Sequence, residues 1–267
     1  MLKFLKRFYI FIIFTFLYAP IAVLIAYSFN SSKSSKWTGF TFDWYIQLFQ
    51  DKQIMNSWGV TLRVAIFSAI IATIIGTMAA IGIANMKKRT RSAVLSVNNI
   101  PVTNPDIITG VSLMLLFIAL RIERGEITLL LAHITFNIPY VILSVLPKLH
   151  QADNMTYEAA LDLGATPFSA FWKVVFHEIK PGIVTGFILA FTLSFDDFMI
   201  SNYTGGTAQT LAVTIFSMTK KKINPKIYAL SSIMFLTVLI LLIIVNLRQD
   251  DNNSKKERKL KKVEKNL

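Results

Sequence analysis

The segment Glu158-Ala159-Ala160-Leu161-Asp162-Leu163-Gly164-Ala165-Thr166-Pro167 is a charged, helix-forming stretch inside an otherwise strongly apolar chain. Residues 156–163 favour a short helix, with Thr156 as its N-cap and Glu158 in its first turn, where a carboxylate is stabilising. Gly164 ends that helix, because glycine tolerates the left-handed or close-contact conformation that helix ends require. The segment therefore predicts a short helix followed by a sharp turn.

A second helix is expected directly after the turn. Thr166-Pro167 begins it, since proline is well suited to the first helical position. Phe168, Phe171 and Trp172 then repeat at helical spacing and form an apolar face. A helix–glycine–helix unit of this kind fits a groove on another protein, and it also resembles an ordinary amphipathic helix pair at a membrane surface.

The composition indicates an integral membrane protein. Of the 267 residues, 54% are hydrophobic and 16% are charged, whereas soluble domains carry roughly 25% charged residues. The net charge of +13 comes from short basic clusters between apolar runs, which suits anionic lipid headgroups and topology setting better than nucleic acid. The absence of cysteine excludes disulfides, thiolate metal sites and cysteine nucleophiles.

Six apolar runs predict an all-α, polytopic membrane protein with six transmembrane helices. The expected spans are residues 8–29, 58–85, 92–120, 127–147, 183–202 and 227–247. Basic clusters before the first run and after the second place the N-terminus, the loop 148–182 and the basic tail 248–267 in the cytoplasm. We thus expect a transmembrane domain over residues 1–247 with both termini cytoplasmic. Lys220, Lys221 and Lys222 oppose the charge rule, because they fall in an expected outer segment.

Two expected spans contain unusual residues. Pro101 and Pro105 interrupt the span 92–120, and broken backbone in a membrane is tolerated where it is buried in protein or lines a water-filled cavity. That span is either part of a pathway wall or a kinked helix without further function. His133 is an ionisable residue in the fourth span, but a lone imidazole is a poor metal site, so we expect an interhelical hydrogen bond.

These features resemble the permease subunits of ABC importers. Their EAA pattern is Glu-Ala-Ala, three residues, Gly, nine residues, then Ile-x-Leu-Pro. Glu158-Ala159-Ala160 and Gly164 match its first half, and Val174 and Phe176 keep apolar residues in the second half. His177 departs from the pattern where the family usually has proline, which leaves the end of the second short helix undefined.

Within that class, the chain is most similar to the second permease of spermidine/putrescine importers. The stretches that carry this resemblance are Tyr18-Ala19-Pro20-Ile21, Ser28-Phe29-Asn30-Ser31-Ser32, Pro105-Asp106-Ile107-Ile108-Thr109-Gly110-Val111-Ser112-Leu113, Glu158 to Pro167, Leu193-Ser194-Phe195-Asp196-Asp197-Phe198, Ile215-Phe216-Ser217-Met218, Asn224-Pro225 and Ala229-Leu230. The resemblance implies a type I ABC importer permease fold in a bacterial cytoplasmic (inner) membrane. It also implies four kinds of partner: two cytoplasmic ATP-binding subunits, a second and different permease, an extracellular or periplasmic polyamine-binding protein, and membrane lipid.

The resemblance assigns two sets of residues. Those expected to couple the chain to the ATPase are Glu158, Ala159, Ala160, Asp162, Gly164, Ala165, Pro167, Phe168 and Phe171. Asp196 and Asp197, with Phe195 and Phe198, are expected to line the substrate path, because polyamines are multiply charged cations. Adjacent helical residues point about 100° apart, so we expect one of the two carboxylates to face the path squarely. Alternatively, both simply mark the exit of the helix into the outer water.

Catalysis, metals and cofactors are not expected. The chain lacks the Gly-x-x-x-x-Gly-Lys-Ser/Thr phosphate loop, so ATP hydrolysis belongs to a partner subunit. A permease for another substrate, such as a metal chelate, thiamine or sulfate, remains an alternative. A gradient-driven secondary transporter is a further one, although such proteins carry ionisable residues at midplane and inverted repeats and need no docking loop.

Overall fold

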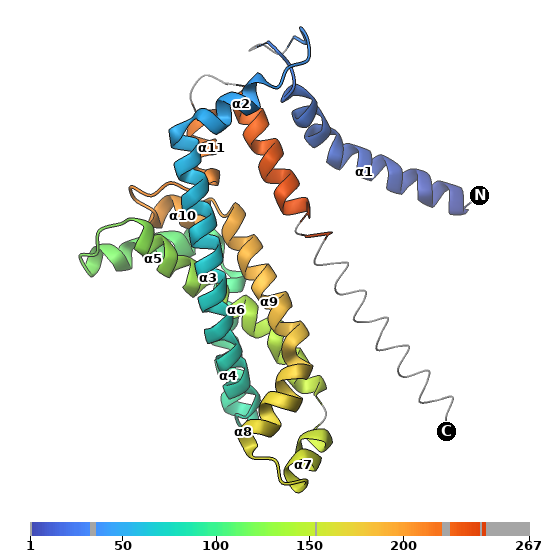
Figure 1. Ribbon diagram of the computed structural model, residues 1–267, viewed down its shortest axis with the longest axis vertical. Coiled ribbons are helices and arrows are strands. Elements are labelled where there is room, and N and C mark those ends of the chain that lie inside the picture. The colour runs from blue at the N-terminus through green and yellow to red at the C-terminus, as the bar shows by residue number, and fades with distance from the viewer. Residues whose placement is uncertain (1, 33–35, 153, 221–224, 241, 244–267) are drawn as a thin grey trace. The chain divides into compact units, whose positions relative to one another are not determined.

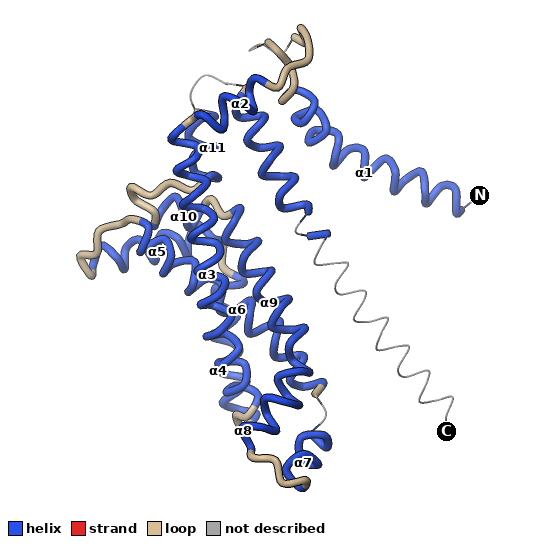
Figure 2. Tube along the Cα trace, in the orientation of Figure 1, coloured by secondary structure: helices blue, strands red, loops and turns tan. Residues whose placement is uncertain are grey.

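The computed structural model describes residues 2–32, 36–152, 154–220, 225–240 and 242–243. Within these residues the chain forms helices and loops (Figure 2). An isolated antiparallel bridge joins Asn30 to Phe40. The expected all-α class is confirmed. The basic tail 248–267, together with Lys221 and Lys222, lies outside the described residues.

The chain divides into two compact units, and it passes between them after Trp58, after Thr210 and after Leu239. The first unit comprises Met1–Trp58 and Leu211–Leu239. Its elements are α1 (Leu2–Tyr27), α2 (Asp43–Gln50), the start of α3 (Lys52–Ala84), α11 (Leu211–Thr219) and the helix Lys226–Ile240 (Figure 1). The second unit is built on Gly59–Thr210.

The core of the first unit forms around α2. Trp44 and Leu48 are buried on one face of α2 and pack with Ile54, Leu211 and Leu230. The indole Nε1 of Trp44 donates a hydrogen bond to the backbone oxygen of Asn30 at 2.7 Å. This bond satisfies the polar tip of a buried aromatic ring and fastens α2 to the loop that follows α1.

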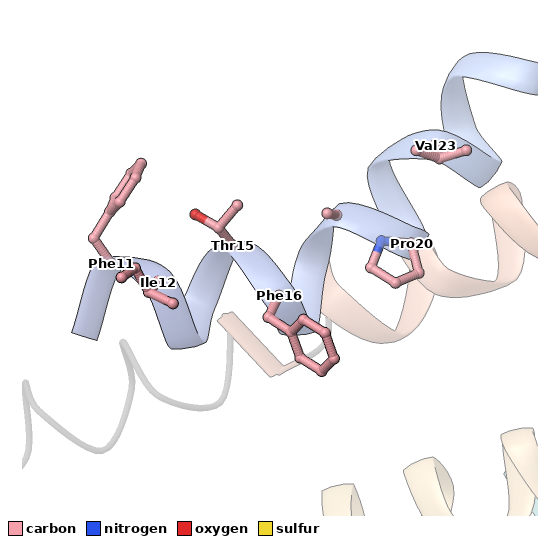
Figure 3. Close-up of a pocket in the computed structure, with 7 residues that line it drawn as sticks. Phe11, Ile12, Thr15, Phe16, Pro20 and Val23 are labelled. Carbon is pink, nitrogen blue, oxygen red and sulfur yellow. The ribbon is translucent and has the colours of Figure 1, made fainter. Parts of the chain in front are cut away.

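Helix α1 is apolar, and its side chains are largely exposed. A groove along α1 is lined by Phe11, Ile12, Thr15, Phe16, Ala19, Pro20 and Val23 (Figure 3). An apolar helix with exposed sides is stable in lipid or against another apolar surface, but not in water. The exposure of α1 therefore agrees with a membrane-embedded chain.

The second unit contains most of the remaining helices. They are α4 (Lys88–Thr103), α5 (Asp106–Ala119), α6 (Glu126–Gln151), α7 (Asn154–Asp162), α8 (Pro167–Ala170), the π-helical turn η1 (Phe171–Val175), α9 (Phe176–Asp196) and α10 (Met199–Thr204). Helices α6 and α9 lie side by side over most of their lengths (Figure 1). Small residues of α3 and α9, including Ala69, Ala80 and Ala190, pack with Val141 and Val145 of α6 in the main core. Such residues let helix backbones approach closely in lipid.

Four helices in the described part of the chain are long and apolar enough to cross a membrane: Lys6–Tyr27, Lys52–Ala84, Glu126–Gln151 and Pro167–Asp196. A fifth span results if α4 and α5 together count as one. The helix Lys226–Ile240 is apolar but shorter. It covers the start of the expected sixth span, 227–247, of which residues 241 and 244–247 are not described.

The expected third span, 92–120, is not one continuous helix. Helices α4 and α5 meet at a bend of 102°, where Asn104 is extended with ψ 144°. The residue before a proline is pushed out of the helical region, so Pro105 makes this break. Pro101, by contrast, lies inside α4.

Replacing Gly76 with alanine is expected to lower the stability of the second unit. A Cβ at Gly76 would lie 2.7 Å from Cβ of Val141, and overpacking of this kind costs about 1–3 kcal/mol. The midpoint of thermal unfolding in detergent should fall. Gly82→Ala on the same helix is the matched control, because no atom of the described residues lies within 4 Å of the added Cβ. Equal midpoints for the two variants would contradict the close packing of α3 on α6.

Candidate functional site

The turn between α7 and α8 has the hydrogen bonds of a Schellman motif. Ala165 N donates to Ala160 O at 3.0 Å, and Gly164 N donates to Leu161 O at 2.9 Å. Gly164 has φ +86°, a conformation that glycine adopts without steric cost. The prediction that Gly164 ends the first helix is confirmed. Of the two reasons expected for a glycine there, the left-handed conformation applies and close contact does not.

Of the two predicted helix starts, that of the second helix is observed and that of the first is not. The side chain of Thr166 accepts a hydrogen bond from Ser169 N at 3.3 Å, and Pro167 occupies the first position of α8. The predicted start of the second helix is confirmed. Thr156 is not the N-cap of the first helix, because α7 begins at Asn154 and Thr156 lies inside it.

Helices α7 and α8 and the turn between them are largely exposed and partly apolar, and we call this helix pair the knob. Of the residues expected to couple to the ATPase, Glu158, Ala159, Asp162, Gly164, Pro167 and Phe168 are exposed, and Ala160, Ala165 and Phe171 are half-buried. The side chain of Leu163 is 89% exposed and that of Phe168 is 76% exposed. Leu163 was missed in the sequence, although its place directly before the helix-ending glycine puts it at the tip of the turn. Both apolar side chains are therefore accessible at this end of the molecule.

The knob continues without interruption into the next long helix. Helix α8, the π-helical turn and α9 together form a single helix, Pro167–Asp196. Within it, Phe176 N donates to Phe171 O, the i to i−5 bond of a π-turn. His177, the residue that departs from the family pattern, lies inside this helix and does not mark a helix end. The second short helix therefore has no separate end.

The same helix ends at Asp196, earlier than the expected boundary at residue 202. Asp197 is extended with ψ 127° and separates α9 from α10. The second compact unit therefore contains two interrupted helical segments, one at α4–α5 and one at α9–α10. Asp196 is exposed at the end of α9.

Asp197 is in a different environment from its neighbour. Its side chain is 6% exposed, and its carboxylate accepts hydrogen bonds from Ser201 N at 2.7 Å and Ile200 N at 3.3 Å. His133 Nε2 lies 3.5 Å from Asp197 Oδ2. The two adjacent carboxylates thus have different surroundings, one open and one enclosed.

The two phenylalanines also differ. Phe195 is fully buried and stacks on Phe191, with ring centroids 5.9 Å apart. Phe198 is half-buried at the start of α10. The ring of Phe195 therefore packs inside this chain, whereas Phe198 keeps part of its surface accessible.

A third carboxylate, Asp106, approaches the aspartate pair. It is exposed in the first turn of α5, directly after the α4–α5 break, and it interacts electrostatically with Asp197 and with the half-buried Tyr140. The approach depends on Gly110, where an added Cβ would lie 3.2 Å from Met199 O and 3.3 Å from Ile200 Cα of α10. Asp106 was missed, since its 90-residue separation from the aspartate pair gives no hint of proximity. No three His, Asp or Glu side chains gather as metal ligands in the described ranges.

Comparison with known proteins identifies the family. Residues 72–252 match the family described as the inner membrane component of binding-protein-dependent transport systems. The chain belongs to this family of transport permeases. The permease is 40% identical to the putrescine transport system permease protein PotI of Escherichia coli strain K12, over 83% of this chain and 82% of the relative. It is 35% identical to the spermidine/putrescine transport system permease protein PotC of Haemophilus influenzae, over 88% of this chain and 93% of the relative.

A solved structure supports the fold. The permease is similar to a chain of a bacterial alginate ABC transporter in complex with an alginate pentasaccharide-bound periplasmic protein, with TM-score 0.68 and 16% identity over 92% of both chains. This permease therefore has the fold of an ABC-importer membrane subunit. Members of the family are not themselves catalytic, and the ATPase is a separate subunit.

Proposed function

We propose that this permease forms part of the translocation path of an ATP-driven importer of polyamines such as putrescine and spermidine. One observation carries the proposal: the continuous helix Pro167–Asp196 has an exposed docking knob at one end and an exposed carboxylate at the other. A rigid helix transmits movement of the knob to the carboxylate. The names of the relatives PotI and PotC support polyamines as the cargo.

The proposed topology has six crossings of a bacterial cytoplasmic membrane and both termini in the cytoplasm. Helix α1, helix α3, the broken pair α4–α5, helix α6, the helix Pro167–Asp196 and the segment from Lys226 onward would be the spans of the domain 1–247. The basic clusters at the N-terminus, at residues 87–91 and in the tail 248–267 would then share one side. The loop 148–182 would lie there too, where ATP is available, so the helix Pro167–Asp196 would begin in the cytoplasm and cross the membrane with its later part.

Four partners follow from this arrangement. Two cytoplasmic ATPase subunits would supply energy, and a periplasmic or extracellular binding protein would deliver the polyamine, as the periplasmic protein in the alginate complex suggests. A second, different permease would complete the path. The exposed apolar sides of α1 would face that permease or lipid.

Coupling would occur at the knob. The small side chains of Ala159 and Ala160 would let an ATPase groove come close, while Glu158 and Asp162 would contribute charge. Gly164 and Ala165 would shape the turn. Pro167, Phe168 and Phe171 would extend the contact onto the second helix, and Leu163 joins them because its side chain is so exposed.

Cargo would pass the carboxylates at the two helix breaks. Asp196 and Asp106 are exposed and would attract an ammonium group, with Phe198 providing an aromatic face. In this proposal the enclosed Asp197 and the buried Phe195 support the path from behind rather than touch the cation.

The experiment that tests this function is uptake of labelled putrescine and spermidine. A strain that lacks its own polyamine importers would express this permease with its ATPase, its second permease and its binding protein. We expect uptake that requires ATP and a loaded binding protein. Normal membrane levels of the complex without uptake of either polyamine would refute the proposed cargo.

A further inference from the structure

A buried polar cluster lies behind the break between α9 and α10. Its side chains are 0–6% exposed, and they belong to Ser68, His133, Asn137, Ser194, Asp197 and Ser201. Burying polar groups costs free energy unless they are hydrogen-bonded. The internal bonds of this cluster therefore decide which conformation of the break is stable.

One half of the cluster ties three helices together before the break. Asn137 Nδ2 of α6 donates to Ser194 Oγ of α9 at 2.8 Å. The hydroxyl of Ser194 also lies 3.0 Å from that of Ser68 on α3. These bonds hold the end of α9 against its neighbours.

The other half fastens the break itself. The carboxylate of Asp197 binds the backbone amides of Ile200 and Ser201, as a capping side chain does at the start of a helix. His133 Nε2 lies 3.1 Å from Ser201 Oγ and 3.5 Å from Asp197 Oδ2. A carboxylate only accepts hydrogen bonds, so this arrangement favours the tautomer with hydrogen on Nε2.

Packing alone does not account for a histidine at this position. His133 is fully buried, and its Nδ1 has no hydrogen-bond partner within the described part of the molecule. A leucine would occupy similar space without an unsatisfied nitrogen. The contact of Nε2 with Asp197 and Ser201 is what histidine adds. The expected interhelical hydrogen bond of His133 is confirmed by the contact from α6 to Ser201 of α10.

We propose that His133 is a positioning residue: by holding Asp197 against α6 it keeps the α9–α10 break in place and so sets where Asp196 faces. The inference rests on the proposed function for the role of Asp196 in transport. Asp196 and Asp197 share a peptide bond, so a rotation of the backbone at Asp197 redirects the carboxylate of Asp196. Asp197 and His133 thereby act on the cargo through Asp196.

A cysteine at position 196 reports on this geometry without any transport. The chain contains no cysteine, so Asp196→Cys provides a single thiol in this permease, and labelling is read on its band after the subunits of the intact complex are separated. A membrane-impermeant, cationic thiol reagent measures how readily position 196 is reached from water. In the His133→Leu background we expect the labelling rate to change by at least about tenfold, because the variant loses both the hydrogen bond to Ser201 Oγ and the contact of Nε2 with the Asp197 carboxylate.

Matched variants separate positioning from simple loss of structure. His133→Gln keeps a side-chain N–H donor and should restore the labelling rate. Thr135→Val on the same helix should leave it unchanged, because the Thr135 hydroxyl bonds to Leu131 O of its own helix. If His133→Leu does not accumulate in the membrane, Asp197→Asn is tested in its place and should shift labelling in the same way. Unaltered labelling in whichever of these two variants accumulates overturns the proposal.

Uptake by chains that keep Asp196 tests the link to transport. His133→Leu should lower the maximal rate by at least about tenfold with the half-saturating polyamine concentration unchanged, because capture belongs to the binding protein. His133→Gln should recover most of that rate. Altered labelling with no polyamine uptake even by the parent chain would refute the proposed cargo and leave the positioning role supported. Altered labelling with normal uptake in His133→Leu would overturn the link to Asp196.

Discussion

Replacing Gly164 with valine is expected to lower the ATP hydrolysis that the loaded binding protein stimulates by at least about tenfold. Gly164 has φ +86°, and a β-branched residue is a steric outlier in that region. No atom of the described residues lies within 4 Å of an added Cβ, so the effect is conformational and not a clash. The turn would open, and Leu163 and Phe168 would no longer present one surface to the ATPase. ATPase activity of the purified complex in lipid measures this effect.

Gly164→Asn is the matched control for this variant. Asparagine enters the left-handed region several times more readily than other non-glycine residues, so stimulated hydrolysis should be largely retained. Membrane levels of both variants should equal those of the parent, because the turn is exposed. Full stimulation in Gly164→Val would show that the turn does not couple the permease to the ATPase.

Replacing Asp196 with asparagine should reduce the initial rate of polyamine uptake by at least about tenfold. The carboxylate is exposed at the helix break, and a unit charge near an ammonium group is worth about 4 kcal/mol at 4 Å near a protein surface. Asparagine keeps the size of the side chain and removes the charge. Stimulated ATP hydrolysis should persist, because the substitution leaves α7, α8 and the turn between them unchanged. Uptake and hydrolysis measured on the same proteoliposomes separate the two effects.

Glu123→Gln provides the control, since it removes an exposed carboxylate from the turn between α5 and α6. Its uptake should match that of the parent. The rate of uptake should fall in Asp106→Asn as it does in Asp196→Asn. Asp106 follows the α4–α5 break and interacts with Asp197, the neighbour of Asp196. Normal uptake by Asp196→Asn would remove this residue from the path.

Local chemistry accounts for the parts of the site that the sequence predicted well. Gly164, Thr166 and Pro167 each act within a few residues of themselves, through a positive φ, a side-chain cap and a fixed proline φ. Such effects are visible in one stretch of sequence. The start of α7 was less well defined, because several residues in succession can begin a helix, and Asn154 begins it ahead of Thr156.

Contacts between distant segments account for the parts that were missed. Asp106 interacts with Asp197 because α5 packs closely on α10 at Gly110, where an added Cβ would lie 3.2 Å from Met199 O. The pairing of His133 with Asp197 joins residues of α6 and of the break after α9. Sequence spacing carries no information about either approach.

The sequence by itself determined that the chain is helical and membrane-embedded, because long apolar runs must satisfy their backbone hydrogen bonds internally in lipid. It also determined the turn between α7 and α8, which depends on neighbouring residues. Only the tertiary structure decided which of two adjacent aspartates is open and which is enclosed. Asp196 is the last residue of α9 and stays exposed, whereas Asp197 turns inward to the amides of α10 and to His133. The bonds to the amides are local, as in a helix cap. The contact with His133 depends on packing of α6 against α10, which no pattern around residues 196 and 197 encodes.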